Sequence, residues 1–234
     1  MKTKKQIKLP FFEIGPKSYL YGDDILELAL IADKASEKYG VDIIFTTPVA
    51  DIRRVREATK NIHVFAPHMD AIYPGRGLAD ILPESIVAAG ADGVMLNHCE
   101  KPLNFETLEK TIKRADEVGL TTIVCADSLS EASKIATLNP DIIVAEPSEL
   151  IGTGVSVGEE YVKAATDSVK KVNPNILVLT AAGISNGQDV YNTIISGADA
   201  TGSSSGVAKA TDRAAMVDEM ICAVRRAYDE RNSK

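Results

Sequence analysis

Short apolar runs alternate along the chain with longer segments in which apolar residues recur at helical spacing. The short runs have the length of buried strands and the longer segments have the period of amphipathic helices, so the pattern predicts about eight strand-helix units. The expected strands are residues 8–14, 42–47, 62–67, 92–97, 121–126, 141–146, 175–181 and 198–203. The expected helices are residues 23–40, 50–60, 84–90, 105–119, 129–138, 158–172, 187–197 and 211–230.

The strand runs are apolar along nearly their whole length, which is typical of parallel strands that helices cover on both faces. The pattern therefore predicts an α/β protein in which each helix forms the crossover between two parallel strands. Eight units in 234 residues fit a closed (β/α)8 barrel with parallel inner strands. An open doubly wound sheet is the alternative, but no G-x-G-x-x-G follows the first strand to bind a dinucleotide. No linker rich in Pro, Gly or Ser divides the chain, so we expect residues 1–234 to form a single domain.

Residues that favour helix boundaries stand at the expected helix ends. Glycine commonly closes a helix, because it adopts left-handed backbone angles without strain. The glycines near expected helix ends are Gly40, Gly90 and Gly119. Asparagine and serine side chains cap helix starts. The candidates are Asn104 and either Ser128 or Ser130.

Composition narrows the classes of function. The chain is 45% hydrophobic and 25% charged, as globular proteins are. Its net charge of −7, with lysines and arginines scattered among acidic residues, gives no basic patch of the kind that binds nucleic acid. No apolar segment approaches the ~18 residues of a membrane span, so we expect neither a nucleic-acid nor a membrane partner. Three cysteines without a CxxC pair suit a reducing compartment, and we expect a cytoplasmic protein.

Polar residues gather where the expected strands end. The first strand is followed by Lys17, the fourth by Asn97, His98 and Glu100, and the sixth ends in Glu146. A lone lysine or histidine at such a place is more often structural than functional. In a barrel, however, the carboxyl ends of all the strands converge, so these side chains are expected to share one site.

The chemistry of these residues suits proton abstraction next to a carbonyl group. An ionised Glu146 can accept a proton, a neutral His98 can donate a hydrogen bond to the oxygen that gains charge, and Lys17 can offset that charge. The glycine- and serine-rich stretches GTG, AAGIS and SSSG expose backbone N–H groups after the last three strands. Loops in that part of a barrel often bind phosphate.

Five stretches carry a resemblance to a known family: PKSY, LNHCE, NPDIIVAEPSELIGTG, AAGIS and SSGVAKA. With their spacing, they resemble triosephosphate isomerase, and in particular its short archaeal-type form, over nearly the whole chain. The resemblance implies that dihydroxyacetone phosphate and glyceraldehyde 3-phosphate are interconverted through an enediol(ate), without a metal or organic cofactor. It also implies that the segment after Glu146 is a lid over the phosphate.

The resemblance assigns roles to residues of this chain. It implies that Lys17 and His98 are catalytic, that Glu146 is the base, and that Glu100 accompanies the histidine. The phosphate would be bound by backbone amides at Gly152, Ser185, Ser205 and Gly206. The family also implies a homo-oligomer, either a dimer or a tetramer.

Three positions of the substrate pocket depart from the family pattern. Gly15 stands where the family has asparagine, and Pro67 where it usually has glutamine. Leu78 stands where the family has a threonine that reaches into the site of the neighbouring subunit. Because these changes would reshape the pocket and leave the proton-transfer residues in place, an isomerase of another small phosphorylated ketose, such as a tetrulose phosphate, is an alternative.

Other classes of function also remain open. Lys17 could form a Schiff base in a phosphate-binding lyase, although the expected neighbouring carboxylates do not favour a nucleophilic amine. A non-catalytic phosphate-binding barrel is a second alternative, against which the catalytic set argues. In a third, His63, His68 and Asp70 would bind a metal, but the two histidines stand at opposite ends of one expected strand and no known motif supports them.

Overall fold

The eight strands form one closed, all-parallel barrel in the computed structural model, which describes residues 3–147, 158–181 and 183–233. Each strand pairs with the next along the chain, and the first pairs with the last. This topology confirms the predicted single-domain (β/α)8 barrel. The strands are β1 (Phe11–Ile14), β2 (Asp42–Thr46), β3 (Ile62–Ala66), β4 (Gly93–Leu96), β5 (Thr121–Ala126), β6 (Ile142–Ala145), β7 (Leu177–Leu179) and β8 (Ala200–Ser203).

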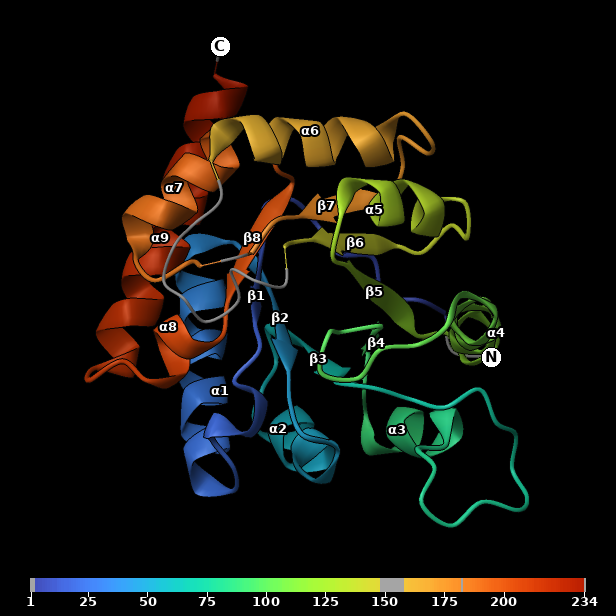
Figure 1. Cartoon of the computed structure of the whole chain (residues 1–234). Helices are drawn as coiled ribbons and strands as arrows, with labels where there is room; N and C mark the ends of the chain where they lie inside the picture. The colour runs from blue at the N-terminus through green and yellow to red at the C-terminus, as the bar shows by residue number, and fades with distance from the viewer. Residues whose placement is uncertain (1–2, 148–157, 182, 234) are drawn as a thin grey trace.

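Helices surround the barrel (Figure 1). The α-helices of the described residues are α1 (Asp23–Tyr39), α2 (Ile52–Ala58), α3 (Pro83–Ala89), α4 (Phe105–Val118), α5 (Leu129–Ala136), α6 (Glu159–Lys170), α7 (Gly187–Ile195), α8 (Ser205–Ala208) and α9 (Arg213–Asn232). Short 3-10 helices span Lys17–Tyr19 and Val49–Asp51. Among the described helices, none contains an 18-residue stretch apolar enough to cross a membrane.

Several boundaries shift from the predicted pattern, among them β7, which spans Leu177–Leu179 and not 175–181, and three further details differ. The first strand begins at Phe11 and not at Lys8, since Pro10 has no N–H to donate to a sheet. The first turn of the expected helix 50–60 is a 3-10 helix that ends at Asp51. The short helix α8 was not expected, because four residues are too few to show a helical period.

The expected helix caps are confirmed. Gly40, Gly90 and Gly119 close α1, α3 and α4 with left-handed backbone angles, and the N–H of each donates to a carbonyl of its helix. The Asn104 side chain accepts from the N–H of Thr107 at the start of α4. At the start of α5 the capping residue is Ser128.

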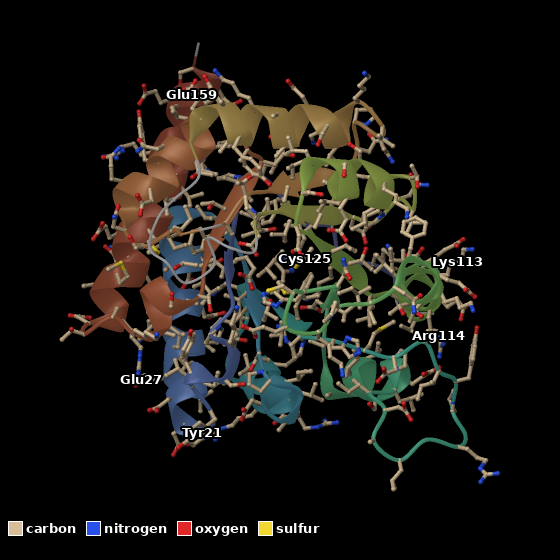
Figure 2. The ribbon with its side chains drawn as sticks, viewed as in Figure 1. Tyr21, Glu27, Lys113, Arg114, Cys125 and Glu159 are labelled. Carbon is tan, nitrogen blue, oxygen red and sulfur yellow. The ribbon has the colours of Figure 1, made fainter. Side chains whose placement is uncertain are left out.

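Alternating strand residues divide the core into two layers. Phe11 packs inside the barrel, whereas its neighbour Phe12 packs in the layer between strands and helices. Cys125, labelled near the centre of Figure 2, belongs to the interior layer. The strand period of two therefore fixes which side chains reach the interior, and the same alternation continues to the carboxyl ends of the strands.

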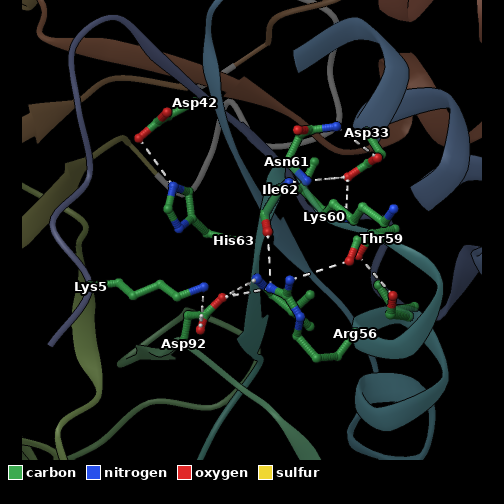
Figure 3. A network of polar contacts seen from close by, with 12 residues as sticks. Lys5, Asp33, Asp42, Arg56, Thr59, Lys60, Asn61, Ile62, His63 and Asp92 are labelled. Atoms are coloured by element: carbon green, nitrogen blue, oxygen red, sulfur yellow. Dashed lines mark hydrogen bonds and ion pairs between the residues drawn. The ribbon is translucent and has the colours of Figure 1, made fainter. Parts of the chain in front are cut away.

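A polar network closes the opposite end of the barrel, where the strands begin (Figure 3). The carboxylate of Asp92, which precedes β4, is buried between Lys5 Nζ at 3.1 Å and Arg56 at 3.1 Å. Two ion pairs and a hydrogen bond from the N–H of Val64 compensate the burial of this charge. In a (β/α)8 barrel this end serves stability and not chemistry.

The two histidines considered as metal ligands lie at different ends of β3. His63 is the second residue of the strand and its Nε2 lies 3.1 Å from Asp42 (Figure 3), whereas His68 follows the strand with its Nε2 3.3 Å from Asp70. Each imidazole thus has its own carboxylate partner. In the parts of the chain that the structure describes, no three His, Cys, Asp or Glu side chains are placed to hold a metal ion.

Candidate active site

A cavity of about 740 Å³ opens at the carboxyl ends of the strands. It brings together the sequence-predicted residues Lys17, His98, Glu100, Glu146, Ser185, Ser205 and Gly206. Gly152, and the segment 148–157 expected to form a lid, lie outside the described residues. Polar groups that are up to 189 positions apart in the sequence, from Lys17 to Gly206, therefore border one space.

Lys17 follows β1 in an unusual backbone conformation, with φ of +50°. Its ammonium group donates to Glu100 Oε1 at 3.0 Å and so connects the end of β1 with the loop after β4. The ion pair also lowers the pKa of the Glu100 carboxyl. A left-handed backbone is costly for a non-glycine residue and commonly marks a functional site.

His98 is held by the loop that follows β4. Asn97, with φ of +57°, precedes it and fixes this loop: its side-chain amide donates to the carbonyl of Cys125 at 2.9 Å and accepts from the N–H of Leu103 at 2.9 Å. The N–H of Glu100 donates to His98 Nδ1 at 3.1 Å, which requires Nδ1 to be unprotonated and places the proton of the neutral ring on Nε2.

The electrostatic surroundings keep the His98 ring neutral. Burial lowers the pKa of the imidazole, and the positive charge of Lys17 lowers it further, whereas Glu100 raises it. A neutral imidazole with its proton on Nε2 is a hydrogen-bond donor that can face a substrate oxygen.

Glu146 stands directly after β6 and is only 9% exposed. Its backbone N–H donates to the carbonyl of Ala126 at 3.1 Å, which continues the pairing of β6 with β5 and fixes the position of the residue. Burial raises the pKa of its carboxyl to about 7; Asp127 adds to the rise, and Lys17 opposes it. A carboxyl group with this pKa is both ionisable near neutral pH and a stronger base than an ordinary glutamate.

The loops after β7 and β8 both line the cavity and pack closely against each other. A Cβ atom at Gly206 would lie 2.6 Å from Ser203 Oγ and 2.7 Å from the carbonyl of Ile184, so only glycine fits there. Ser204 Oγ is buried and has no hydrogen-bond partner among the described residues. The N–H and the Oγ of Ser185 both donate to Asp189, so a phosphate bound at this amide would have to displace that carboxylate.

Of the three departures from the family pattern, two border this cavity. Gly15 and Pro67 line it, at the ends of β1 and β3. Leu78 does not line it; the side chain is fully exposed in the loop between β3 and α3, which extends away from the barrel in Figure 1.

The cavity also contains ionisable groups that the sequence analysis did not place in this site, two of which, His68 and Asp70, it had considered only as metal ligands. Glu13 and Lys209 line it, as do His68 and Asp70. For Glu13 a signal was present, because it is a charge inside the apolar run FFEI, two residues from the inward-facing Phe11. Lys209 and the His68–Asp70 pair carry no comparable signal, since their directions depend on how the loops fold.

The fold and the cavity together define a class of protein. A (β/α)8 barrel that gathers a buried weakly acidic carboxyl group, a donating imidazole and an ammonium group at one end can move a proton at a carbon beside a carbonyl group. Barrels of this kind bind their substrates among the loops at the carboxyl ends of the strands.

Comparison with known proteins gives the family. A profile described as "Triosephosphate isomerase" matches residues 21–220. A protein of that name from Methanobacterium bryantii is 38% identical over 208 residues, which cover 87% of this chain and 92% of the relative. Another from Sulfurisphaera tokodaii is 35% identical over 230 residues, 96% of this chain and 100% of the relative. The chain belongs to the triosephosphate isomerase family, as its motifs predicted.

The arrangement around His98 predicts a specific tautomer. In ¹⁵N NMR spectra of the labelled protein, His98 should give a protonated Nε2 and an unprotonated Nδ1 at pH 7. Because its pKa is lowered, the ring should stay neutral to a lower pH than an ordinary histidine. The chain has three histidines, and His98→Gln identifies the relevant signals. A cationic His98 at pH 7, or a proton on Nδ1, would contradict this geometry.

Proposed function

We propose that this chain interconverts dihydroxyacetone phosphate and glyceraldehyde 3-phosphate. The name shared by its relatives supports this reaction, and so does the chemistry of the cavity. The single observation that carries the proposal is that Lys17, His98 and Glu146, which follow three different strands, border one cavity. Isomerisation moves one proton between two carbon atoms and another between two oxygen atoms, so it requires only acid-base groups and no redox partner.

Glu146 would act as the base. Its carboxylate removes the proton from the carbon atom beside the carbonyl group, and the resulting carboxylic acid returns a proton to the neighbouring carbon. A pKa of about 7 serves both steps near neutral pH, since the group neither holds its proton too tightly nor gives it up too readily.

His98 and Lys17 would stabilise the enediolate. The Nε2–H of His98 donates to the oxygen that gains negative charge, and the ammonium group of Lys17 offsets that charge. Glu100 holds both groups in place, because its carboxylate accepts from Lys17 and its backbone N–H binds His98 Nδ1. Glu100 would therefore act as a positioning residue.

The phosphate group would bind beside the loops after β7 and β8. Ser205 and Gly206 offer backbone amides there, Ser185 would offer its own once the phosphate displaces Asp189, and we propose Gly152 as a further contact. Lys209 borders the same part of the cavity and adds a positive charge. Amides and one lysine can hold a phosphate in an acidic protein without an arginine cluster.

A four-carbon substrate is not favoured, because the relatives from Methanobacterium bryantii and Sulfurisphaera tokodaii both carry the triose name. The Schiff-base lyase and the non-catalytic barrel are not favoured for the same reason. The departures at Gly15 and Pro67 therefore reshape the wall of the cavity without pointing to a different reaction.

Isomerase activity is tested by following both substrates and their exchange with solvent. Wild-type protein should interconvert the two triose phosphates and incorporate deuterium from D₂O at carbon. Glu146→Gln removes the base and should lower kcat by about 10²–10⁴-fold. Glu106→Gln, the same change on the exposed surface of α4, should leave kcat unchanged. Full activity in Glu146→Gln, or no exchange with the wild type, would overturn the proposed function.

We also propose that the chain forms a homo-oligomer through the loop that contains Leu78. The family resemblance implies this assembly. Two large apolar side chains of the loop face solvent in the single chain, since Leu78 is fully exposed and Tyr73 is 62% exposed. Burial of such a loop against a second copy would remove apolar surface from water.

Light scattering tests the assembly. The wild type should have at least twice the mass of one chain, and Leu78→Asp should shift the population towards the single chain. Val172→Asp, which changes another exposed apolar residue in the turn after α6, serves as the matched control and should keep the wild-type mass. A monomeric wild type, or an unchanged mass for Leu78→Asp, would disprove an interface at this loop.

A further inference from the structure

Glu13 places a second carboxyl group in the interior of the barrel. It lies in the middle of β1 and pairs in register with Ile44 of β2 and Gly202 of β8. The side chain points inward, like that of Phe11 two residues earlier, and lines the floor of the cavity although only 7% of the residue is exposed. Its neighbours on this floor are largely apolar: Met95, Cys125, Val144, Leu179 and Ala181.

The surrounding strands leave a fitted space for this carboxyl group. A Cβ atom at Gly15 would lie 2.8 Å from Glu13 Oε1, and one at Gly202 would lie 3.1 Å from Glu13 Oε2. Neither glycine has the left-handed backbone that would itself require glycine. The absence of a side chain at position 15, a departure from the family pattern, thus leaves the space that the Glu13 carboxyl group occupies.

Among the described residues, Thr46 binds one oxygen atom of the Glu13 carboxyl group, and the other oxygen atom is left to accept a hydrogen bond. Thr46 Oγ1 donates to Glu13 Oε1 at 2.6 Å, and no described residue donates to Oε2. Burial raises the pKa of this group to about 7, Glu146 adds to the rise, and Thr46 and Lys17 lower it. A carboxyl group buried among apolar side chains is costly, and one hydroxyl partner compensates only part of that cost. Such costs are typical of binding and catalytic sites.

The other polar groups at this end of the cavity are mainly donors. Lys17 has only N–H groups to offer, and His98 presents its Nε2–H because Nδ1 is already bound. These donors suit a carbonyl oxygen. The triose phosphates also carry a hydroxyl group beside the carbonyl, and its O–H needs an acceptor that is not the base acting on carbon.

We propose that Glu13 is the substrate-binding acceptor for that hydroxyl group. Its free oxygen accepts the O–H from the floor of the cavity while Thr46 holds the other oxygen. Glu13 thereby selects phosphorylated substrates that carry a hydroxyl group next to the reacting carbonyl. The inference rests on the proposed function for the identity of the substrate, but the binding site itself does not depend on turnover.

Titration calorimetry with two ligands measures how much the hydrogen bond between Glu13 and the ligand hydroxyl group adds to the affinity. Inorganic phosphate carries only the phosphate, whereas glycerol 3-phosphate also carries hydroxyl groups. The wild type should bind glycerol 3-phosphate more tightly than phosphate. Glu13→Leu should lower the affinity for glycerol 3-phosphate by about 10- to 100-fold, as expected for the loss of a hydrogen bond to a charged group. The same change should leave the affinity for inorganic phosphate unchanged. Glu13→Gln, which keeps an acceptor oxygen and the shape of the side chain, should show a smaller loss.

Two further variants separate binding from structure. Thr46→Val removes the hydroxyl group that orients Glu13. It should lower the affinity for glycerol 3-phosphate, by a smaller factor than Glu13→Leu, and leave the affinity for phosphate unchanged. Glu106→Gln should change neither affinity. Wild-type affinity for glycerol 3-phosphate in both Glu13→Leu and Glu13→Gln would overturn the inference, as would parallel losses for both ligands.

Kinetics then distinguishes this inference from the proposed function. In an active wild type, Glu13→Leu should lower kcat/KM for glyceraldehyde 3-phosphate by a similar factor, with Glu13→Gln in between. If the wild type has no isomerase activity but the ligand-selective loss occurs, the proposed reaction is wrong and the hydroxyl site stands. If the wild type is active and Glu13→Leu retains its full kcat/KM, the role of Glu13 is refuted and the reaction stands.

Discussion

Closure of the barrel by β1 and β8 is the constraint on which the candidate site depends. The two strands pair in register from Phe11 with Ala200 to Ile14 with Ser203, and the N–H of Gly15 continues the contact to the carbonyl of Ser203. This pairing brings the lysine after the first strand to the loop after the last. Without it, the acid-base groups and the glycine-rich loops would border separate surfaces, and no common cavity would form.

Within that cavity, burial and charge act against each other on the same groups. Burial raises the pKa of Glu146 and of Glu13 to about 7, while Lys17 lowers both. The same lysine helps to keep His98 neutral. One ammonium group therefore lowers the pKa of both carboxyl groups and of the imidazole, and its pairing with Glu100 keeps it in position near all three. The strained backbone at Lys17 is consistent with that shared demand.

Much of this arrangement could be predicted from local sequence patterns. Strand runs, helix caps and the polar residues at strand ends depend on short-range periodicity, and the family motifs add the expected partners of Glu146. To predict that the Glu13 side chain points inward, the alternation of side chains along β1 has to be combined with the closure of the barrel. The contacts of Lys209 and of the His68–Asp70 pair depend on loop conformations, which periodicity does not encode. The roles assigned to the site residues remain predictions.

The proposed reaction depends on Glu146 as a base whose pKa burial has raised. The most direct test is kcat/KM for glyceraldehyde 3-phosphate measured from pH 5 to pH 9 in Glu13→Gln, because Glu13 also has a pKa of about 7 and its amide does not titrate. Because only the ionised carboxylate accepts a proton, activity should begin to fall at a midpoint near pH 7, and protonation of the substrate phosphate should steepen the fall only below about pH 6. The phosphate of the substrate itself ionises near pH 6. A midpoint at pH 6 or below would therefore leave no titration to assign to Glu146 and would contradict the account.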